Sequence, residues 1–270
     1  RLLSPEEYGI IAIVMVFILL ANVFVESGFN TALVQKKDAD EVDFSSVLYL
    51  SLGVAIILYG IIFITAPLIA SFYNQPILVK VLRVLSITLF IGAFNSIQNA
   101  YVARNMLFKK LFTSSLGSVT ISGVVGIIAA FRGSGVWALV LQQLTSQLAV
   151  AVILWFTVKW RPHLIFSTTR VKSLFSYGSK LLASGLLDTL YSNLRTLLIG
   201  RMYTPSMLGY YNRGQQFPQL IVSNINGSIQ SVMLPALSAH QDDRKRVKEM
   251  MRRAIVSSSF LIFPMMVGMA

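Results

Sequence analysis

The 270-residue sequence contains no cysteine and only two histidines. Disulfide bonds and thiolate metal sites are therefore excluded, and two isolated histidines form no metal-binding constellation. Charged residues make up only 13% of the chain, and the 11 acidic residues are outnumbered by 23 Lys and Arg. Together with 55% hydrophobic residues and a mean hydropathy of +0.68, this composition excludes an ordinary soluble domain. We expect neither a cofactor nor a metal.

Eight long apolar stretches make up most of the sequence. They span residues 7–33, 43–73, 76–103, 111–131, 135–158, 173–199, 206–237 and 251–270. Each one supplies the ~20 apolar residues that a helix needs to cross ~30 Å of hydrocarbon. The sequence therefore predicts an all-α polytopic membrane protein.

The basic residues lie mainly in every second loop. These loops are residues 34–42, 104–110, 159–172 and 238–250, and the last is followed by Arg252 and Arg253. The opposite loops hold only Arg1, Lys80, Arg83, Arg132 and Arg201. The positive-inside rule predicts that the first set is cytoplasmic in a multi-pass protein of the cell membrane. Because the cations are divided among short loops, the net charge of +12 does not indicate nucleic-acid binding.

A short repeat relates the two ends of the chain. The segment RLLSPEEYG at residues 1–9 returns as RMYTPSMLG at residues 201–209. In both copies a Ser or Thr is predicted to cap a helix that starts with Pro, and Glu7 completes a capping box in the first copy. About 25 residues later, TALVQKKDAD has a looser echo in PALSAHQDDR. Both copies cross the membrane in the same direction, which predicts a parallel repeat and a bundle of two lobes.

This repeat divides the chain into three parts. We expect residues 1–158 to form the first lobe, residues 159–172 a basic cytoplasmic linker, and residues 173–270 the start of the second lobe. In the linker, cations alternate with apolar residues, which favours a helix lying on the membrane surface. The absence of an initial Met and the apolar run that reaches Ala270 indicate a protein truncated at both ends.

Several strings along the chain resemble one family. They are GFNTALVQ (28–35), VLRVLS (81–86), GVWALVLQQ (135–143), WRP (160–162), LLIGR (197–201) and LGYYNRGQQF (208–217). Together they resemble the oligosaccharide flippases, exporters of lipid-linked polysaccharide repeat units in the multidrug/oligosaccharidyl-lipid/polysaccharide superfamily. The resemblance implies two six-helix lobes, of which this chain covers about helices 2–9. One departure is Arg195, since relatives often carry an acidic residue before the LLIG string.

Charged residues inside the apolar stretches are the candidate site. Residues 173–199 carry Lys180, Asp188 and Arg195, and the next stretch carries Arg213. A charge at the centre of a membrane helix costs roughly 2.5–3.5 kcal/mol, so each one requires a reason. In a wet cavity between lobes, these cations would attract a diphosphate. The alternatives are that Asp188 pairs with a neighbouring cation, or that the long side chains reach toward the membrane surfaces.

Other polar groups are weaker candidates. Asn22, Glu26 and Asn30 form one stripe on the first helix, where Glu26 is a candidate for the cavity or an ion site. Two amide clusters, in residues 95–99 and 142–147, either contact the substrate or bond helices to one another.

The predicted function is translocation of a polyprenyl-diphosphate-linked oligosaccharide by alternating access, for surface polysaccharides such as O-antigen, capsule, exopolysaccharide or a teichuronic-type polymer. The expected partners are this glycolipid, membrane lipids, H⁺ or Na⁺ as a coupling ion, and a polysaccharide polymerase machinery. No catalytic set is visible, so we expect no enzyme. One alternative is a drug or cation exporter of the same superfamily, which would need a cavity rich in carboxylates. Another is a membrane-embedded glycan polymerase, which would need a large outer loop.

Overall fold

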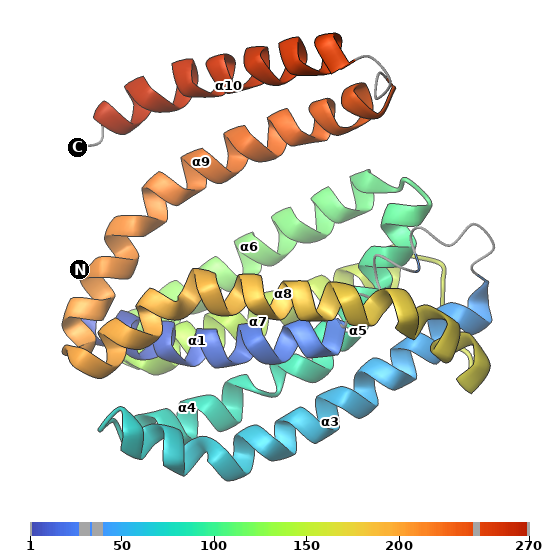
Figure 1. Cartoon of the computed structure of the whole chain (residues 1–270). Helices are drawn as coiled ribbons and strands as arrows, with labels where there is room; N and C mark the ends of the chain where they lie inside the picture. The colour runs from blue at the N-terminus through green and yellow to red at the C-terminus, as the bar shows by residue number, and fades with distance from the viewer. Residues whose placement is uncertain (1, 27–32, 34–39, 240–243, 269–270) are drawn as a thin grey trace. The chain divides into compact units, whose positions relative to one another are not determined.

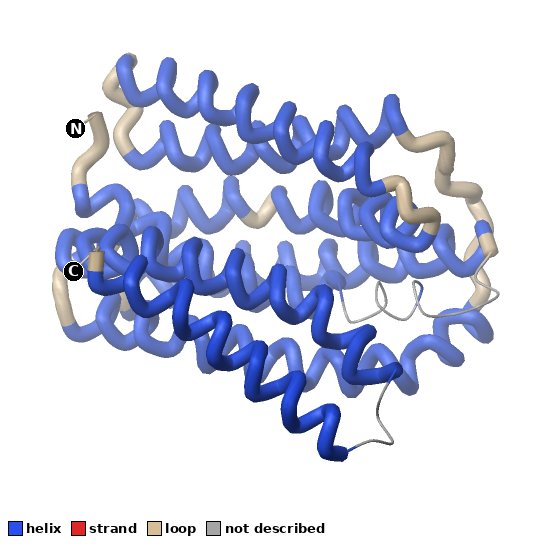
Figure 2. The backbone as a smooth tube through the Cα atoms, turned by 90° about the horizontal axis from the view of Figure 1, so that it is seen from above, coloured by secondary structure: helices blue, strands red, loops and turns tan. Residues whose placement is uncertain are grey.

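The computed structural model describes residues 2–26, 33, 40–239 and 244–268, and α-helices account for the secondary structure in these ranges (Figures 1 and 2). In chain order the helices are α1 (Pro5–Glu26), α3 (Glu41–Phe72), α4 (Ile77–Leu85), α5 (Thr88–Arg104), α6 (Phe108–Phe131), α7 (Val136–Thr157), α8 (Thr168–Met202), α9 (Pro205–Ala239) and α10 (Arg244–Val267). The helices coincide with the predicted apolar stretches, and the stretch at 76–103 is divided into α4 and α5. The prediction of an all-α polytopic membrane protein is confirmed.

Among the described residues, six helical segments are long and apolar enough to cross a membrane. They are α1, α3, the combined α4 and α5, α6, α7 and the Lys245–Val267 part of α10. The two remaining helices, α8 and α9, have 35 residues each and reach ~52 Å at 1.5 Å per residue. Both helices are long enough to cross a membrane, but their polar residues give them a lower hydropathy than the six segments above.

Both copies of the predicted repeat begin a helix with the expected caps. The backbone N–H of Glu7 donates to Ser4 Oγ (3.3 Å), and the N–H of Ser4 donates to Glu7 Oε2 (2.6 Å). In the second copy, the N–H of Met207 donates to Thr204 Oγ1 (3.3 Å). The capping box and the second N-cap are therefore confirmed. The looser second half of the repeat lies largely outside the described residues.

The two copies also contact each other. A methyl group built on Gly9 would overlap the carbonyl oxygen of Pro205, and one built on Gly209 would overlap the carbonyl oxygen of Pro5. Only glycine fits so close to a carbonyl, because its Cα carries a second hydrogen in place of a Cβ. Such Cα–H···O contacts recur where helices approach closely. The first turns of α1 and α9 therefore meet in a reciprocal manner, as expected for a repeat related by a two-fold axis.

Small residues on α8 let it pack against α1. Gly185 faces Val23, whereas Gly200 faces Ile13, so the two helices run antiparallel. A Cβ at Gly200 would lie 3.1 Å from a side-chain atom of Ile13. Small residues at such contacts let membrane helices approach closely, because association in lipid depends on packing.

The chain divides into two compact units, Arg1–Gly209 and Tyr210–Ala270. The first unit contains helices α1 to α8 and the first turn of α9. The second unit contains the rest of α9 and α10, which form a helical hairpin (Figure 1). Although α8 packs on α1 within the first unit, the expected lobe boundary at residues 159–172 stays a prediction.

One end of the first unit gathers three of the loops that are predicted to be cytoplasmic. Arg104 Nη1 donates to the carbonyl oxygen of Leu33 (2.9 Å), and Lys110 Nζ donates to that of Thr157 (2.7 Å). The side of the membrane that this end faces stays a prediction.

The linker between α7 and α8 is not a surface helix. Residues 158–167 have no helical structure, and α8 begins at Thr168, so that part of the prediction was wrong. The reason is that Trp160 is only 4% exposed and stacks on Tyr101, with ring centroids 6.1 Å apart. The linker is thus held against the first unit, whereas Leu164 remains 95% exposed.

Candidate functional site

A polar stripe runs along α8. It consists of Lys180, Ser184, Asp188, Tyr191 and Arg195. The spacings of four, four, three and four residues place these side chains within about 80° of one another around the helix. The stripe therefore extends for ~22 Å along one face of α8, at 1.5 Å per residue. We call it the α8 polar stripe.

The α8 polar stripe lies away from the surface that packs on α1. All five of its side chains are exposed, and Tyr191 is 80% exposed. On the opposite side, Thr196 is buried and Gly185 and Gly200 contact α1. The helix thus packs through its small residues and leaves its charged residues open.

Within the described residues, Lys180, Asp188 and Arg195 form no ion pair, although Asp188 and Arg195 share the stripe. The pairing alternative is therefore not formed in this part of the chain. Charges in hydrocarbon are costly, so we expect this face to meet water or a charged ligand. Two cations and one carboxylate give the stripe a net positive charge.

Arg213 lies in the second unit, so the cavity that it was predicted to share with Lys180 and Arg195 stays a prediction. Its side chain is exposed and donates from Nη1 to Gln216 Oε1 (2.7 Å), one helical turn further along α9. The guanidinium is thus oriented by its own helix.

The two described candidate residues on α1 lie in different environments, one half-buried and one exposed. Asn22 is half-buried, and its Oδ1 lies 3.2 Å from the position that a Cβ on Gly92 of α5 would occupy. Its amide therefore packs inside the first unit. Glu26 is the last residue of α1 and is exposed. Asn30 lies outside the described residues.

The amide clusters meet in the interior of the first unit. Asn95 Nδ2 donates to both the backbone oxygen and Oε1 of Gln147 (3.0 Å each), which links α5 to α7. Gln98 is fully buried, and both of its amide atoms lack a partner among the described residues. These side chains contribute to helix packing within the first unit, and a role in substrate contact stays a prediction.

A charged corner at the start of α3 was not foreseen. Asp40 and Asp43 form a reciprocal capping box, and Arg170 of α8 contacts Asp40 Oδ2 (3.2 Å) and Asp43 Oδ2 (3.4 Å). The side chain of Asp43 is fully buried. The Asp-x-x-Asp pattern before an apolar run was the available signal for the capping box, whereas the partner 127 residues away had none.

Two neighbouring serines complete this corner. The backbone N–H groups of His163 and Ser167 donate to Ser45 Oγ (3.1 Å) and Ser46 Oγ (3.0 Å). The corner therefore fixes the end of the linker and the first turn of α8, and so sets where the α8 polar stripe begins.

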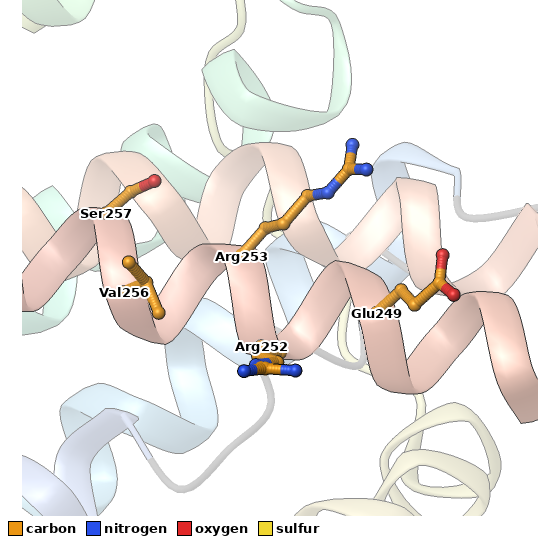
Figure 3. A pocket seen from close by; sticks show the side chains of 5 residues that line it. All are labelled: Glu249, Arg252, Arg253, Val256 and Ser257. Atoms are coloured by element: carbon orange, nitrogen blue, oxygen red, sulfur yellow. The ribbon is translucent and has the colours of Figure 1, made fainter.

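The second unit contains a basic pocket on α10. Its volume is about 520 Å³, and it is lined by Glu249, Arg252, Arg253, Val256 and Ser257 (Figure 3). From the sequence, the two arginines were expected to anchor the topology and to contact anionic lipid headgroups. In Figure 3, the side chains of Glu249, Arg253 and Ser257 follow one edge of the helix, while Arg252 and Val256 follow another.

The comparisons with known proteins agree with one another. A family described as "Polysaccharide biosynthesis protein" matches residues 1–270. The chain is 26% identical to the teichuronic acid biosynthesis protein TuaB of Bacillus subtilis over 92% of its length, which covers 52% of TuaB. It is 23% identical to the succinoglycan biosynthesis transport protein ExoT of Rhizobium meliloti, with 100% of the chain and 54% of ExoT covered.

A third relative is the lipopolysaccharide biosynthesis protein WzxC of Escherichia coli, which is 24% identical over 100% of the chain and 55% of WzxC. The chain thus spans about half the length of these curated relatives. No solved structure matches it.

Proposed function

Because the chain belongs to the polysaccharide biosynthesis protein family, we propose that the complete protein moves a polyprenyl-diphosphate-linked oligosaccharide across the cytoplasmic membrane. The cargo combines a hydroxyl-rich glycan and an anionic diphosphate with a long apolar tail. Unaided passage of its headgroup through hydrocarbon is prohibitive, because polar groups would lose their hydrogen bonds. A hydrated cationic path for the headgroup removes this cost.

The α8 polar stripe carries the proposal. It supplies two cations, two hydroxyl groups and one carboxylate on a single open face of a helix long enough to span the membrane. Arginine and lysine suit phosphate oxygens, and hydroxyl groups suit the sugar. Asp188 lowers the net charge, so the headgroup is held weakly enough to leave.

The repeat supports alternating access. Transporters with parallel repeats rock two halves around a central path. The reciprocal contact of Gly9 with Pro205 and of Gly209 with Pro5 joins the first turns of α1 and α9. We propose that this contact closes the outer end of the path in one state and separates in the other.

The sign of the stripe favours an anionic cargo over a drug cation. An organic cation would require an excess of carboxylates, whereas the α8 polar stripe contains one carboxylate and two cations. The names of the relatives refer to teichuronic acid, succinoglycan and lipopolysaccharide. These names support a cargo that belongs to polysaccharide biosynthesis, and the name of ExoT supports a transport role.

Transport by the purified full-length protein in proteoliposomes tests the proposal. A fluorescent polyprenyl-diphosphate-linked sugar is loaded, and its appearance in the opposite leaflet is followed by lectin capture. We expect Arg195→Ala and Lys180→Ala to lower the rate at least about tenfold, which is the size of one lost charge-assisted hydrogen bond. Arg132→Ala and Lys80→Ala are matched controls, because both side chains are exposed outside the stripe. Equal rates in all four variants would contradict the proposal.

A further inference from the structure

A continuous row of side chains winds along α10. Residues 249, 253, 257, 261 and 265 follow one another at intervals of four, so each lies one turn above the last and about 40° further round the helix. In order they are Glu249, Arg253, Ser257, Leu261 and Met265. The row changes from charged to polar to apolar over ~24 Å of the helix axis.

Two pockets lie on this row, one at each end. The basic pocket of about 520 Å³ contains Glu249, Arg253 and Ser257 (Figure 3). A second pocket of about 400 Å³ contains Leu261 and Met265. Both volumes fall within the ~300–1,000 Å³ of small-molecule sites.

The second pocket is an apolar groove between the two helices of the hairpin. Leu220, Ile221 and Ile225 of α9 line it together with Leu261 and Met265 of α10. Every lining side chain is apolar, so this groove suits a hydrocarbon chain. Arg253 precedes Leu261 by eight residues, which places the cation ~12 Å from the groove along the axis.

Charge complementarity identifies the occupant. The basic pocket contributes two guanidinium groups against one carboxylate, and Ser257 adds a hydroxyl. Guanidinium groups bind phosphate oxygens in a bidentate manner. A ligand that satisfies both pockets at once carries phosphate at one end and an apolar chain of more than ~12 Å at the other.

We infer that the row on α10 is a docking track for a polyprenyl phosphate, with the diphosphate on Arg252 and Arg253 and the isoprenoid chain in the groove against α9. The track lies apart from the α8 polar stripe along the chain and belongs to the second unit. The assignment of a polyprenyl phosphate as the lipid rests on the proposed function. The track holds the carrier by its phosphate and its tail.

The test measures binding instead of transport. The full-length protein is placed in nanodiscs of zwitterionic phosphatidylcholine, and the dissociation constant of farnesyl diphosphate is measured. We expect Arg253→Ala to raise this constant at least about tenfold, because a hydrogen bond to a charged group is lost. Lys248→Ala is the matched control, since it removes one exposed cation of the same helix outside the pocket. Arg253→Lys, which keeps the charge, is expected to retain part of the affinity.

A second pair of variants tests the apolar end. Leu261→Ser should weaken binding of farnesyl diphosphate several-fold and leave binding of inorganic diphosphate unchanged. Ile255→Ser serves as its control, because Ile255 is 62% exposed on another face of α10. Inorganic diphosphate binding as tightly as farnesyl diphosphate would overturn the inference.

Three other results would also overturn it. The first is an equal loss in Lys248→Ala, which would indicate general charge attraction. The second is loss of farnesyl diphosphate binding when phosphatidylglycerol replaces phosphatidylcholine, which would assign the site to ordinary anionic lipids. The third is that the unsubstituted protein does not bind farnesyl diphosphate and that Arg253→Ala lowers its thermal stability. This result would indicate that further helices of the full-length protein cover the row.

The two proposals can fail independently. Arg195→Ala should lower the transport rate at least about tenfold and leave the affinity of α10 for farnesyl diphosphate unchanged. If the α8 variants transport normally while Arg253→Ala loses the ligand, the proposed function fails and the docking track stands.

Discussion

Gly9 lies so close to the carbonyl oxygen of Pro205 that no methyl group fits between them, and Gly209 meets Pro5 in the same way. The four residues occupy equivalent places in the two copies of the repeat. The repeat in the sequence is therefore also a repeat in space. The contact joins the first turns of two helices, and under the proposed function it closes one end of the path.

This contact predicts that Gly9→Ala destabilises the protein and slows transport. The added methyl group meets backbone atoms, which cannot turn aside, and overpacking of this kind costs typically 1–3 kcal/mol. We expect a lower apparent melting temperature in detergent and a lower transport rate. Gly60→Ala is the control, because a Cβ on Gly60 has nothing within 4 Å. Indistinguishable melting temperatures for the two variants would disprove the close contact.

The charged corner predicts a strong effect of Arg170→Ala. Arg170 is one of the partners of the fully buried Asp43 carboxylate, and truncation removes its hydrogen bond and its charge. The cost is expected to be about 1–3 kcal/mol, since a buried acceptor loses a donor. Glu41→Ala removes the contact with His163 and one acidic side chain from the first turn of α3. Both side chains of that contact are more than half exposed, so the cost is expected to be less than about 1 kcal/mol. Thermal unfolding of both variants measures the difference.

Substitution of Gln98 is expected to leave the stability unchanged or to raise it, in contrast to Arg170→Ala. Its amide is fully buried, and its nitrogen and oxygen have no hydrogen-bond partner among the described residues. Gln98→Met keeps the length of the side chain and removes the unpaired polar atoms, so stability should stay equal or rise. Asn95→Leu should lower stability by about 1 kcal/mol, because Asn95 is bonded to Gln147. If Gln98→Met is stable but transports poorly, Gln98 serves the cargo or its water instead of packing.

Much of the fold was predictable because membrane helices have a strong local signal. A run of ~20 apolar residues and a Ser or Thr before Pro depend only on neighbours in the chain. The helix starts at Pro5 and Pro205 were therefore predicted correctly, together with their caps.

Contacts between distant segments carried no such signal. Nothing near Trp160 in the sequence shows that its ring is buried against Tyr101, so the linker was wrongly predicted to be a surface helix. The pairing of Arg170 with Asp43 was missed for the same reason. The α8 polar stripe was predictable only in part, because helical spacing gives the face that residues share but not what that face meets.

The central claim is that the α8 polar stripe faces water and not acyl chains. Because these 270 residues contain no cysteine, single cysteines can be introduced once any cysteine elsewhere in the full-length protein is replaced by serine. The decisive measurement is the reaction rate of a membrane-impermeant thiol reagent with Ser184→Cys, compared with Ile64→Cys on α3, a residue that is 75% exposed on an apolar helix. The account predicts that Ser184→Cys reacts at least about tenfold faster and is protected by the polyprenyl-diphosphate-linked sugar, since thiolate chemistry needs water. Equal and slow reaction at both positions would place the stripe in a dry environment and contradict the account.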